Sequence, residues 1–210
     1  MRSRTVALAA AFVALALAGA GAFAYRQLAA PVSRFAVATV GAERLKLASA
    51  YLRPGRAGAV ELVAYFPDFS PAGVFADVAA TTDLDDRFAR LVFIGLRPAD
   101  PALDPAERTA RLYQRFLDEN SWSHPGGLVA RAFVDGSPFE GDELFYVAPE
   151  GRDFAARCRR PDPARKTPNT CIAEFRLGDL DVELRFAASL LSQWSALKEG
   201  ARGLIEAAKR

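Results

Sequence analysis

The sequence predicts an α+β protein: an antiparallel β-sheet with one mid-chain helix and a C-terminal helix packed on it, preceded by a single N-terminal transmembrane helix. Three observations lead to this prediction. Several segments alternate apolar and polar residues with a period of two, as half-buried strands do. The chain from about Ala188 onward places apolar residues at helical spacing. Residues 5–25 contain no charged side chain.

The apolar segment Thr5–Tyr25 predicts the location of the protein. As a helix rising about 1.5 Å per residue it reaches about 30 Å, the thickness of the hydrocarbon core of a bilayer. Arg2 and Arg4 precede it and favour a cytoplasmic N-terminus. We expect a single-pass protein of the bacterial inner membrane with its C-terminal domain in the periplasm. The alternative is a secreted protein, cleaved after Ala24 because Ala22 and Ala24 suit a signal peptidase.

Both alternatives export the rest of the chain. We divide it into a cytoplasmic N-terminus (1–4), the anchor or uncleaved signal (5–25), a spacer (26–34) and an exported domain (35–210). Apolar residues make up 51% of the sequence, enough for a real core. Without Arg2 and Arg4, the 27 basic residues fall to the number of acidic residues, which is 25. This balance removes the basic surplus that nucleic-acid binding requires, so we expect no nucleic-acid partner.

Alternation predicts the strands of the exported domain. The strongest pattern is a hairpin at the C-terminal end, in which residues 171–177 and 180–186 flank the turn Gly178-Asp179. A second hairpin is predicted to join residues 45–51 to residues 60–66. Further single strands are predicted at 90–97, 128–134 and 144–147. The segment between 67 and 86 has no sustained period and predicts a long connection.

Capping residues mark the start of the mid-chain helix. Asp104 is followed by Pro105 at the first helical position and by Glu107 where a capping box places its acid. Leu112, Tyr113, Phe116 and Leu117 form its expected buried stripe. In the C-terminal helix, Gly200 and Gly203 predict either a bend or the close approach of a neighbour. We expect both helices to cover the same face of the sheet.

Two cysteines, Cys158 and Cys171, are the only ones in the chain. In an oxidising compartment such a pair predicts one disulfide, which stabilises the fold by about 3 kcal/mol for a loop of this length. A structural zinc site requires four ligands, and the chain offers two thiols and a single histidine. We therefore expect no metal and no cofactor. Asp83, Asp85 and Asp86 lack EF-hand spacing, and we interpret them as solvated loop acids.

The loop between the cysteines is the densest basic segment of the exported part. It contains Arg159, Arg160, Arg165 and Lys166 against one acid, Asp162. A cationic loop closed by a disulfide suits an anionic lipid, a cell-wall polymer or an acidic envelope protein. These four residues are the candidate partner-binding residues. The alternative is a solvated hairpin loop.

His124 is the only histidine, so any histidine-dependent catalysis must use it. It lies in the segment Ser121–Gly127, which is typical of a flexible loop, and the chain contains no G-x-S-x-G motif to present a nucleophile. We interpret it as a solvated loop histidine and assign no catalytic residue. The expected function is thus a binding or assembly module of the cell envelope. One alternative is a secreted or anchored hydrolase using His124, and another is a carrier of a small molecule or lipid.

Overall fold

The computed structural model describes residues 34–55, 58–73, 88–161 and 169–209, all within one compact unit, Arg34–Arg210. The predicted anchor, Thr5–Tyr25, lies outside the described residues. Within the described ranges, no helix combines the length and apolar character that crossing a bilayer requires. The transmembrane segment therefore stays a prediction.

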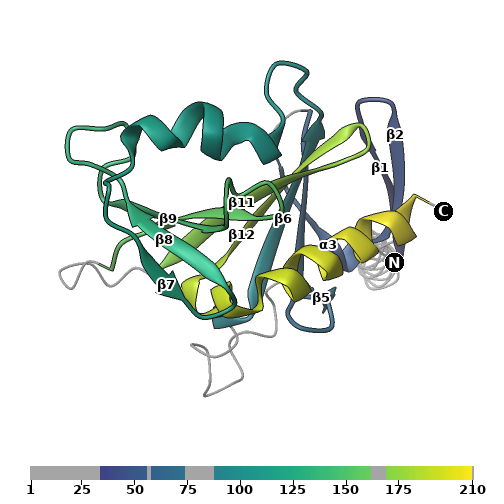
Figure 1. Cartoon of the computed structure of the whole chain (residues 1–210). Coiled ribbons are helices and arrows are strands. Elements are labelled where there is room, and N and C mark those ends of the chain that lie inside the picture. The colour runs from purple at the N-terminus through teal and green to yellow at the C-terminus, as the bar shows by residue number, and fades with distance from the viewer. Residues whose placement is uncertain (1–33, 56–57, 74–87, 162–168, 210) are drawn as a thin grey trace, which may run out of the picture. The chain divides into compact units, whose positions relative to one another are not determined.

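A ten-stranded antiparallel sheet is the main element of the unit (Figure 1). Its strands follow one another from edge to edge as β3 (Leu52–Arg53), β4 (Val60–Tyr65), β6 (Leu91–Pro98), β12 (Leu180–Ala187), β11 (Thr170–Leu177), β10 (Ala155–Arg159), β9 (Asp142–Val147), β8 (Leu128–Ala132) and β7 (Trp122–His124). A short strand, β5 (Ser70–Pro71), pairs with β4 beside this path. The predicted antiparallel sheet is confirmed.

The C-terminal hairpin forms as the alternation predicted. Strands β11 and β12 pair from Thr170 opposite Ala187 to Leu177 opposite Leu180. Gly178 occupies the turn with a φ of 62°, a conformation that glycine adopts without steric cost. On its other side β12 pairs with β6, the predicted strand at 90–97, which itself pairs with β4. The hairpin and β6 thus form the middle of the sheet.

The N-terminal hairpin differs from the prediction. Residues 45–48 belong to β2 (Glu43–Ala48), which pairs with β1 (Phe35–Val40) in a separate two-stranded sheet. In the described part of the chain, β4 pairs on that side with Leu52 and Arg53, which follow the predicted residues 45–51. A tight turn with Gly41 at a φ of 58° joins β1 to β2, and a 3₁₀ turn at Ser49–Tyr51 separates β2 from β3. The prediction was wrong because it missed the turn at Gly41.

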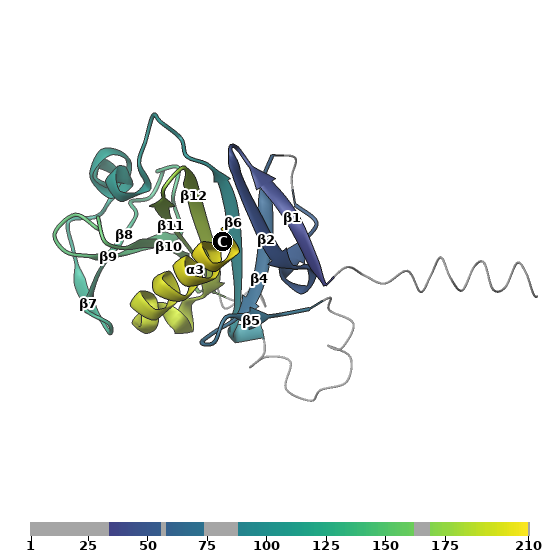
Figure 2. The same cartoon turned by 90° about the vertical axis from the view of Figure 1, so that its right-hand side faces the viewer.

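The C-terminal helix covers one face of the sheet, which we call the core face. A 3₁₀ segment, η6 (Ala188–Gln193), leads into α3 (Trp194–Ala208), which buries Leu197, Ala201 and Ile205 in the main core. The β1–β2 hairpin joins the same core, and Lys209 at the end of α3 forms an ion pair of 2.8 Å with Glu43 (Figure 2). The packing of the C-terminal helix on the sheet is confirmed.

Gly200 of α3 marks a close approach, one of the two outcomes predicted for it. A Cβ atom at this position would lie 2.1 Å from the ring of Phe69. Phe69 is buried in the main core, and Tyr51 donates a hydrogen bond of 3.0 Å to its carbonyl oxygen. At Gly203 a Cβ atom would meet nothing within 4 Å. Gly200 therefore permits the close packing of Phe69 on α3, whereas no neighbouring residue requires a glycine at position 203.

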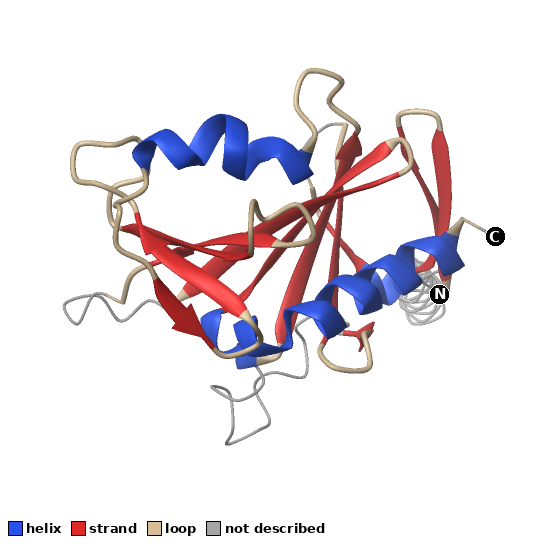
Figure 3. Ribbon diagram, viewed as in Figure 1, coloured by secondary structure: helices blue, strands red, loops and turns tan. Residues whose placement is uncertain are grey.

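The mid-chain helix consists of three short helical turns, η3 (Pro105–Glu107), η4 (Thr109–Tyr113) and η5 (Gln114–Phe116), of 3₁₀, π and 3₁₀ type. As predicted, Asp104 caps the first turn by accepting a hydrogen bond of 2.9 Å from the backbone N–H of Ala106. The turns pack on the face opposite to α3, so the expectation of one shared face is wrong (Figure 3). The reason is a second apolar cluster on that face, formed by Leu117, Phe133, Leu144 and Tyr146.

Candidate functional site

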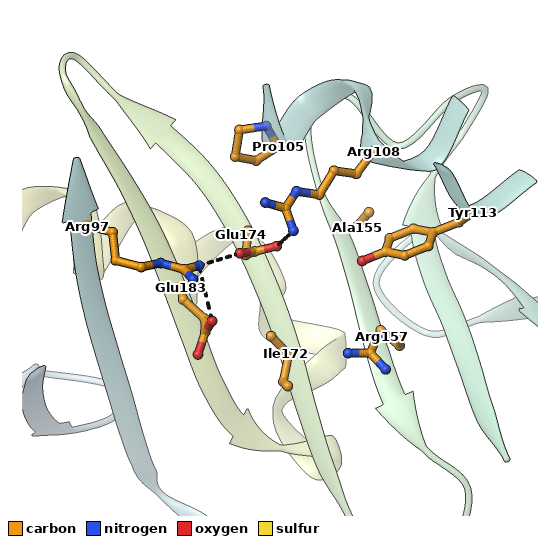
Figure 4. Close-up of a pocket in the computed structure, with 9 residues that line it drawn as sticks. All are labelled: Arg97, Pro105, Arg108, Tyr113, Ala155, Arg157, Ile172, Glu174 and Glu183. Atoms are coloured by element: carbon orange, nitrogen blue, oxygen red, sulfur yellow. Dashed lines mark hydrogen bonds and ion pairs between the residues drawn. The ribbon is translucent and has the colours of Figure 1, made fainter. Parts of the chain in front are cut away.

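Two adjoining hollows open on the face of the sheet opposite to α3. Figure 4 shows the smaller one, which lies beside the turns η3 and η4. Their volumes are about 200 and 280 Å³, and they share Arg97, Ile172 and Glu183 as lining residues. We call the two together the charged groove. It is lined by Ala59, Glu61, Gly95, Arg97, Pro105, Arg108, Tyr113, Ala155, Arg157, Ile172, Glu174, Glu183 and Arg185.

Strand register explains why these side chains meet. Residues that are paired across antiparallel strands point to the same face of the sheet. Glu174 of β11 is paired with Glu183 of β12, Glu183 with Gly95 of β6, and Gly95 with Glu61 of β4. Four strands thus bring three carboxylates into one row, with a glycine between two of them. The missing side chain at Gly95 leaves room for the larger hollow.

Arginines separate the carboxylates of this row. Arg97 binds Glu174 at 2.8 Å and Glu183 at 3.3 Å. Arg185 binds Glu183 and Glu61, both at 3.3 Å. Arg108, from the end of η3, binds the second oxygen of Glu174. We call this continuous series of ion pairs the ion-pair chain, and its order is Arg108, Glu174, Arg97, Glu183, Arg185 and Glu61.

Two further polar side chains enter the groove from the side of the helical turns. Tyr113 lines the smaller hollow, and Figure 4 shows its hydroxyl group directed toward it. Arg157 of β10 lines the same hollow and binds Asp142 at 2.6 Å. The Nε atom of Arg108 is buried and has no hydrogen-bond partner. The Tyr113 hydroxyl is therefore the polar group that the helical turns direct toward the smaller hollow.

Burial changes the ionisation of the central carboxylate. The side chain of Glu174 is 12% exposed, and this burial raises its pKa above the ordinary value of 4.5. The positive charges of Arg108 and Arg97 act in the opposite direction, and neighbouring Glu183 adds to the rise. The net direction is upward, so the ion pairs offset only part of the desolvation.

The chemistry available in the groove is charge and hydrogen-bond recognition. Its titratable lining residues are four arginines, three glutamates and one tyrosine. No histidine, cysteine, serine or threonine lines either hollow, so neither holds a serine or cysteine nucleophile paired with a histidine base. Across the described ranges, no group of three or more His, Cys, Asp or Glu residues is placed to hold a metal ion.

His124 lies elsewhere, at the end of the edge strand β7 instead of in a loop. Its Nδ1 atom is 2.9 Å from the carbonyl oxygen of Pro125, and its ring stacks edge-on against Phe145 at 5.0 Å. The nearby acid is Glu143. Burial raises its pKa above the ordinary value, and the positive charges of Arg160 and His124 offset only part of this rise. His124 does not line the charged groove. The hydrolase alternative thus rests on a histidine outside both hollows.

The turn after His124 is held against the C-terminal region. Trp194 donates a hydrogen bond of 2.9 Å from its indole nitrogen to the carbonyl oxygen of Gly126. A Cβ atom at Gly126 would lie 2.8 Å from the backbone oxygen of Ser192. The glycines expected to make this segment flexible thus include one that permits close packing.

The predicted disulfide is present and fully buried. Cys158 and Cys171 lie directly opposite each other on β10 and β11. Of the four candidate basic residues between them, Arg165 and Lys166 lie outside the described residues. Arg159 binds Asp142 at 3.1 Å, and the backbone N–H of Arg160 donates to Gly141. The described part therefore shows no assembled basic site at this loop.

The residues of the ion-pair chain were not predicted as a site. The signal was present in the alternation: Glu174 lies between the buried residues Ala173 and Phe175, and Glu183 between Val182 and Leu184. Alternation tells which residues face away from the core. It does not tell which strands are neighbours, and the site depends on the order β4, β6, β12 and β11.

No known protein-family model matches the sequence, and no curated protein matches it. Two solved structures are similar to this chain. One is Smlt3025, an immunity protein of the Stenotrophomonas maltophilia type IV secretion system, with 15% identity, a TM-score of 0.60, and coverage of 84% of this chain and 94% of that one. The other is FrpD, an iron-regulated outer membrane lipoprotein of Neisseria meningitidis, with 12% identity, a TM-score of 0.49, and coverage of 84% and 93%. At 15% identity, the likeness to Smlt3025 concerns the fold alone.

Proposed function

We propose that this chain is a cell-envelope protein whose exported domain binds a protein partner through the charged groove. The ion-pair chain is the observation that carries the proposal. It places alternating charges on an open sheet face, where a partner with the opposite pattern can replace or extend each pair. Such a charge pattern discriminates between partners, because a like or unpaired charge buried in the interface weakens the binding of the wrong partner.

The location of the domain is supported by two features. The apolar segment Thr5–Tyr25 follows two arginines, which favours export of everything after it. The buried disulfide between Cys158 and Cys171 suits an oxidising compartment such as the periplasm. An anchored domain stays near the inner membrane, whereas cleavage after Ala24 would release it. The proposed binding function is the same in both cases.

The kind of partner is suggested by the likeness to Smlt3025, an immunity protein. Complexes between immunity proteins and protein toxins are among the tightest known associations. We infer that the partner of this chain is a toxin-class protein that reaches the cell envelope. A lipid or a cell-wall polymer would offer repeated negative charge, whereas the groove contains three carboxylates among its four arginines.

The test is photo-cross-linking in cells of the source bacterium. A photoreactive phenylalanine analogue replaces Ile172, which lines both hollows, and a control carries it at exposed Val134. We expect one protein adduct at position 172 that is absent at position 134. Adducts only with lipid or wall polymer, or no adduct, would contradict the proposal.

A second measurement examines the toxin class directly. The partner identified by mass spectrometry is expressed in the periplasm of a host, with and without the full chain. We expect the chain to restore growth and the Arg97→Glu variant, folded and equally abundant, to restore it poorly. If the partner proves harmless, the binding function stands and the immunity role is wrong.

A further inference from the structure

We propose that the outer face of the β1–β2 hairpin rests on the surface of an anionic bilayer. Alternation divides the hairpin into two faces. Val40, Leu45 and Leu47 are buried in the main core, whereas Phe35 and Val37 point outward and are 58% and 68% exposed. These two are among five large apolar side chains exposed in the described ranges, and they are neighbours on one face of one strand.

Basic residues share this outer face. Val37 is paired with Lys46 and Thr39 with Arg44, so both cations lie beside the apolar side chains. The Lys46 ammonium group is 5.5 Å from the centre of the Phe35 ring. The acid of the hairpin, Glu43, is paired with buried Val40 on the inner face and binds Lys209. The outer face therefore combines apolar and basic side chains without an acid.

This combination fits a bilayer surface better than a protein surface. Aromatic and aliphatic groups enter the interface while lysine and arginine contact anionic headgroups. The sequence supplies proximity as well. Phe35 follows the spacer 26–34, which reaches at most about 30 Å from the apolar segment when fully extended. The inference thus rests on the anchoring part of the proposed function.

Membrane docking in this manner leaves the charged groove accessible. The hairpin packs against the core face of β4 and β6, with Leu62 and Ile94 in the shared core. The groove residues Glu61 and Gly95 alternate with these and belong to the opposite face. A partner that arrives from the periplasm can therefore reach the groove while the hairpin faces the lipid.

The experiment uses the full-length chain in lipid nanodiscs. An environment-sensitive fluorophore is attached to Val37→Cys, since the native cysteines are oxidised and do not react. A control label is attached to Asp135→Cys, in the exposed turn between β8 and β9. Discs contain phosphatidylcholine alone or with phosphatidylglycerol, and spin-labelled lipid serves as quencher. In anionic discs we expect quenching at position 37 to exceed that at position 135 about threefold.

Two changes should remove this difference. Combined Arg44→Gln and Lys46→Gln substitution, or an increase from about 0.1 M to about 0.5 M salt, should lower quenching at position 37 to the control level. Equal quenching at both positions in anionic discs, or failure of the chain to enter the discs, would overturn the proposal. A label at Thr39→Cys provides a second position if Val37→Cys does not fold. Arg97→Glu should leave quenching unchanged, so a failed groove and a failed docking face are distinguishable.

Discussion

The two faces of the large sheet are built from the same strands but are completed differently. On β12, the core-face residues Val182, Leu184 and Phe186 are buried beneath α3 and the β1–β2 hairpin. Their neighbours Glu183 and Arg185 belong to the ion-pair chain and line the charged groove. The core face is covered by apolar contacts, whereas the opposite face carries ion pairs that line the charged groove.

The two faces therefore contribute differently to the stability of the domain. Apolar burial stabilises the fold, since each fully buried aliphatic side chain contributes about 1.5–3 kcal/mol. Partly exposed ion pairs contribute about 0–1 kcal/mol each, because solvent screens them and ordering the side chains opposes them. The ion-pair chain therefore contributes little to holding the domain together, as expected if its role is the partner binding that we propose. Each prediction below tests one side of this contrast.

The largest effect should come from neighbouring substitutions on β12. Leu184 is 0% exposed, and Leu184→Ala should lower the free energy of unfolding by about 2–5 kcal/mol, because a cavity is left in the core. Arg185→Ala should lower it by at most about 1 kcal/mol, because the lost ion pairs are partly solvated. Urea unfolding of both variants measures the two values. Equal losses would show that the groove face stabilises the fold as strongly as the core.

The next effect compares the two glycines of α3. Gly200→Ala should destabilise the domain by about 1–3 kcal/mol, because the new methyl group overlaps the Phe69 ring. Gly203→Ala should stabilise it by up to about 1 kcal/mol, because alanine favours the helix and the space is open. Thermal unfolding distinguishes the two signs. Stabilisation by both substitutions would mean that α3 does not press on Phe69.

The same contrast explains what the sequence could predict. The hairpin of β11 and β12, the strand β6 and the C-terminal helix follow from apolar periodicity, and the disulfide follows from Cys158 and Cys171. Strand β10 was missed because AARCR shows little apolar alternation. The position of the mid-chain helix on the opposite face of the sheet was missed. The apolar cluster around Leu144, on which it packs, forms only when β8 and β9 pair.

The site was harder to predict because it depends on contacts between distant segments. Glu61 and Arg185 are 124 residues apart and meet across β4, β6 and β12. In the sequence, basic residues such as Arg159 and Arg160 cluster in one loop, whereas the charged residues of the strands are far apart and each is typical of a solvated position. The strand order is what brings the outward-facing polar residues of β4, β6, β12 and β11 together on one surface.

The third effect concerns partner binding. Arg97→Glu should weaken it about tenfold or more, since an acid would then replace the cation between Glu174 and Glu183. Gly95→Leu should weaken binding by filling the larger hollow, and a Cβ atom there meets only ordinary contacts, at 3.6 Å to Glu183. Calorimetric titration with the cross-linked partner measures both. Unchanged affinity in both variants would place the interface elsewhere, and Asp135→Ala serves as an exposed control.

The smallest effect is a pH dependence of stability that originates in the groove. Burial raises the pKa of Glu174, so between pH 4.5 and the raised pKa the folded chain holds more protons at this group than the unfolded chain. The stabilisation from Glu174 is complete below pH 4.5 and is lost as the pH rises through the raised pKa. Glu174→Gln removes this titration, while Glu143, whose pKa is also raised, remains in both proteins.

The difference in unfolding free energy, wild type minus Glu174→Gln, should therefore fall with rising pH. Its slope must be smaller than the roughly 1.4 kcal/mol per pH unit that one full proton gives. The change of this difference with pH is the informative quantity, and its absolute size is not. Glutamine also deprives Arg97 and Arg108 of a charged partner, which alters the absolute size at every pH above the transition. A rising difference would mean that the two arginines outweigh burial and hold Glu174 as an ordinary ion pair. The charged face would then contribute to stability at neutral pH, and its contrast with the core face would be smaller than the burial of Glu174 indicates.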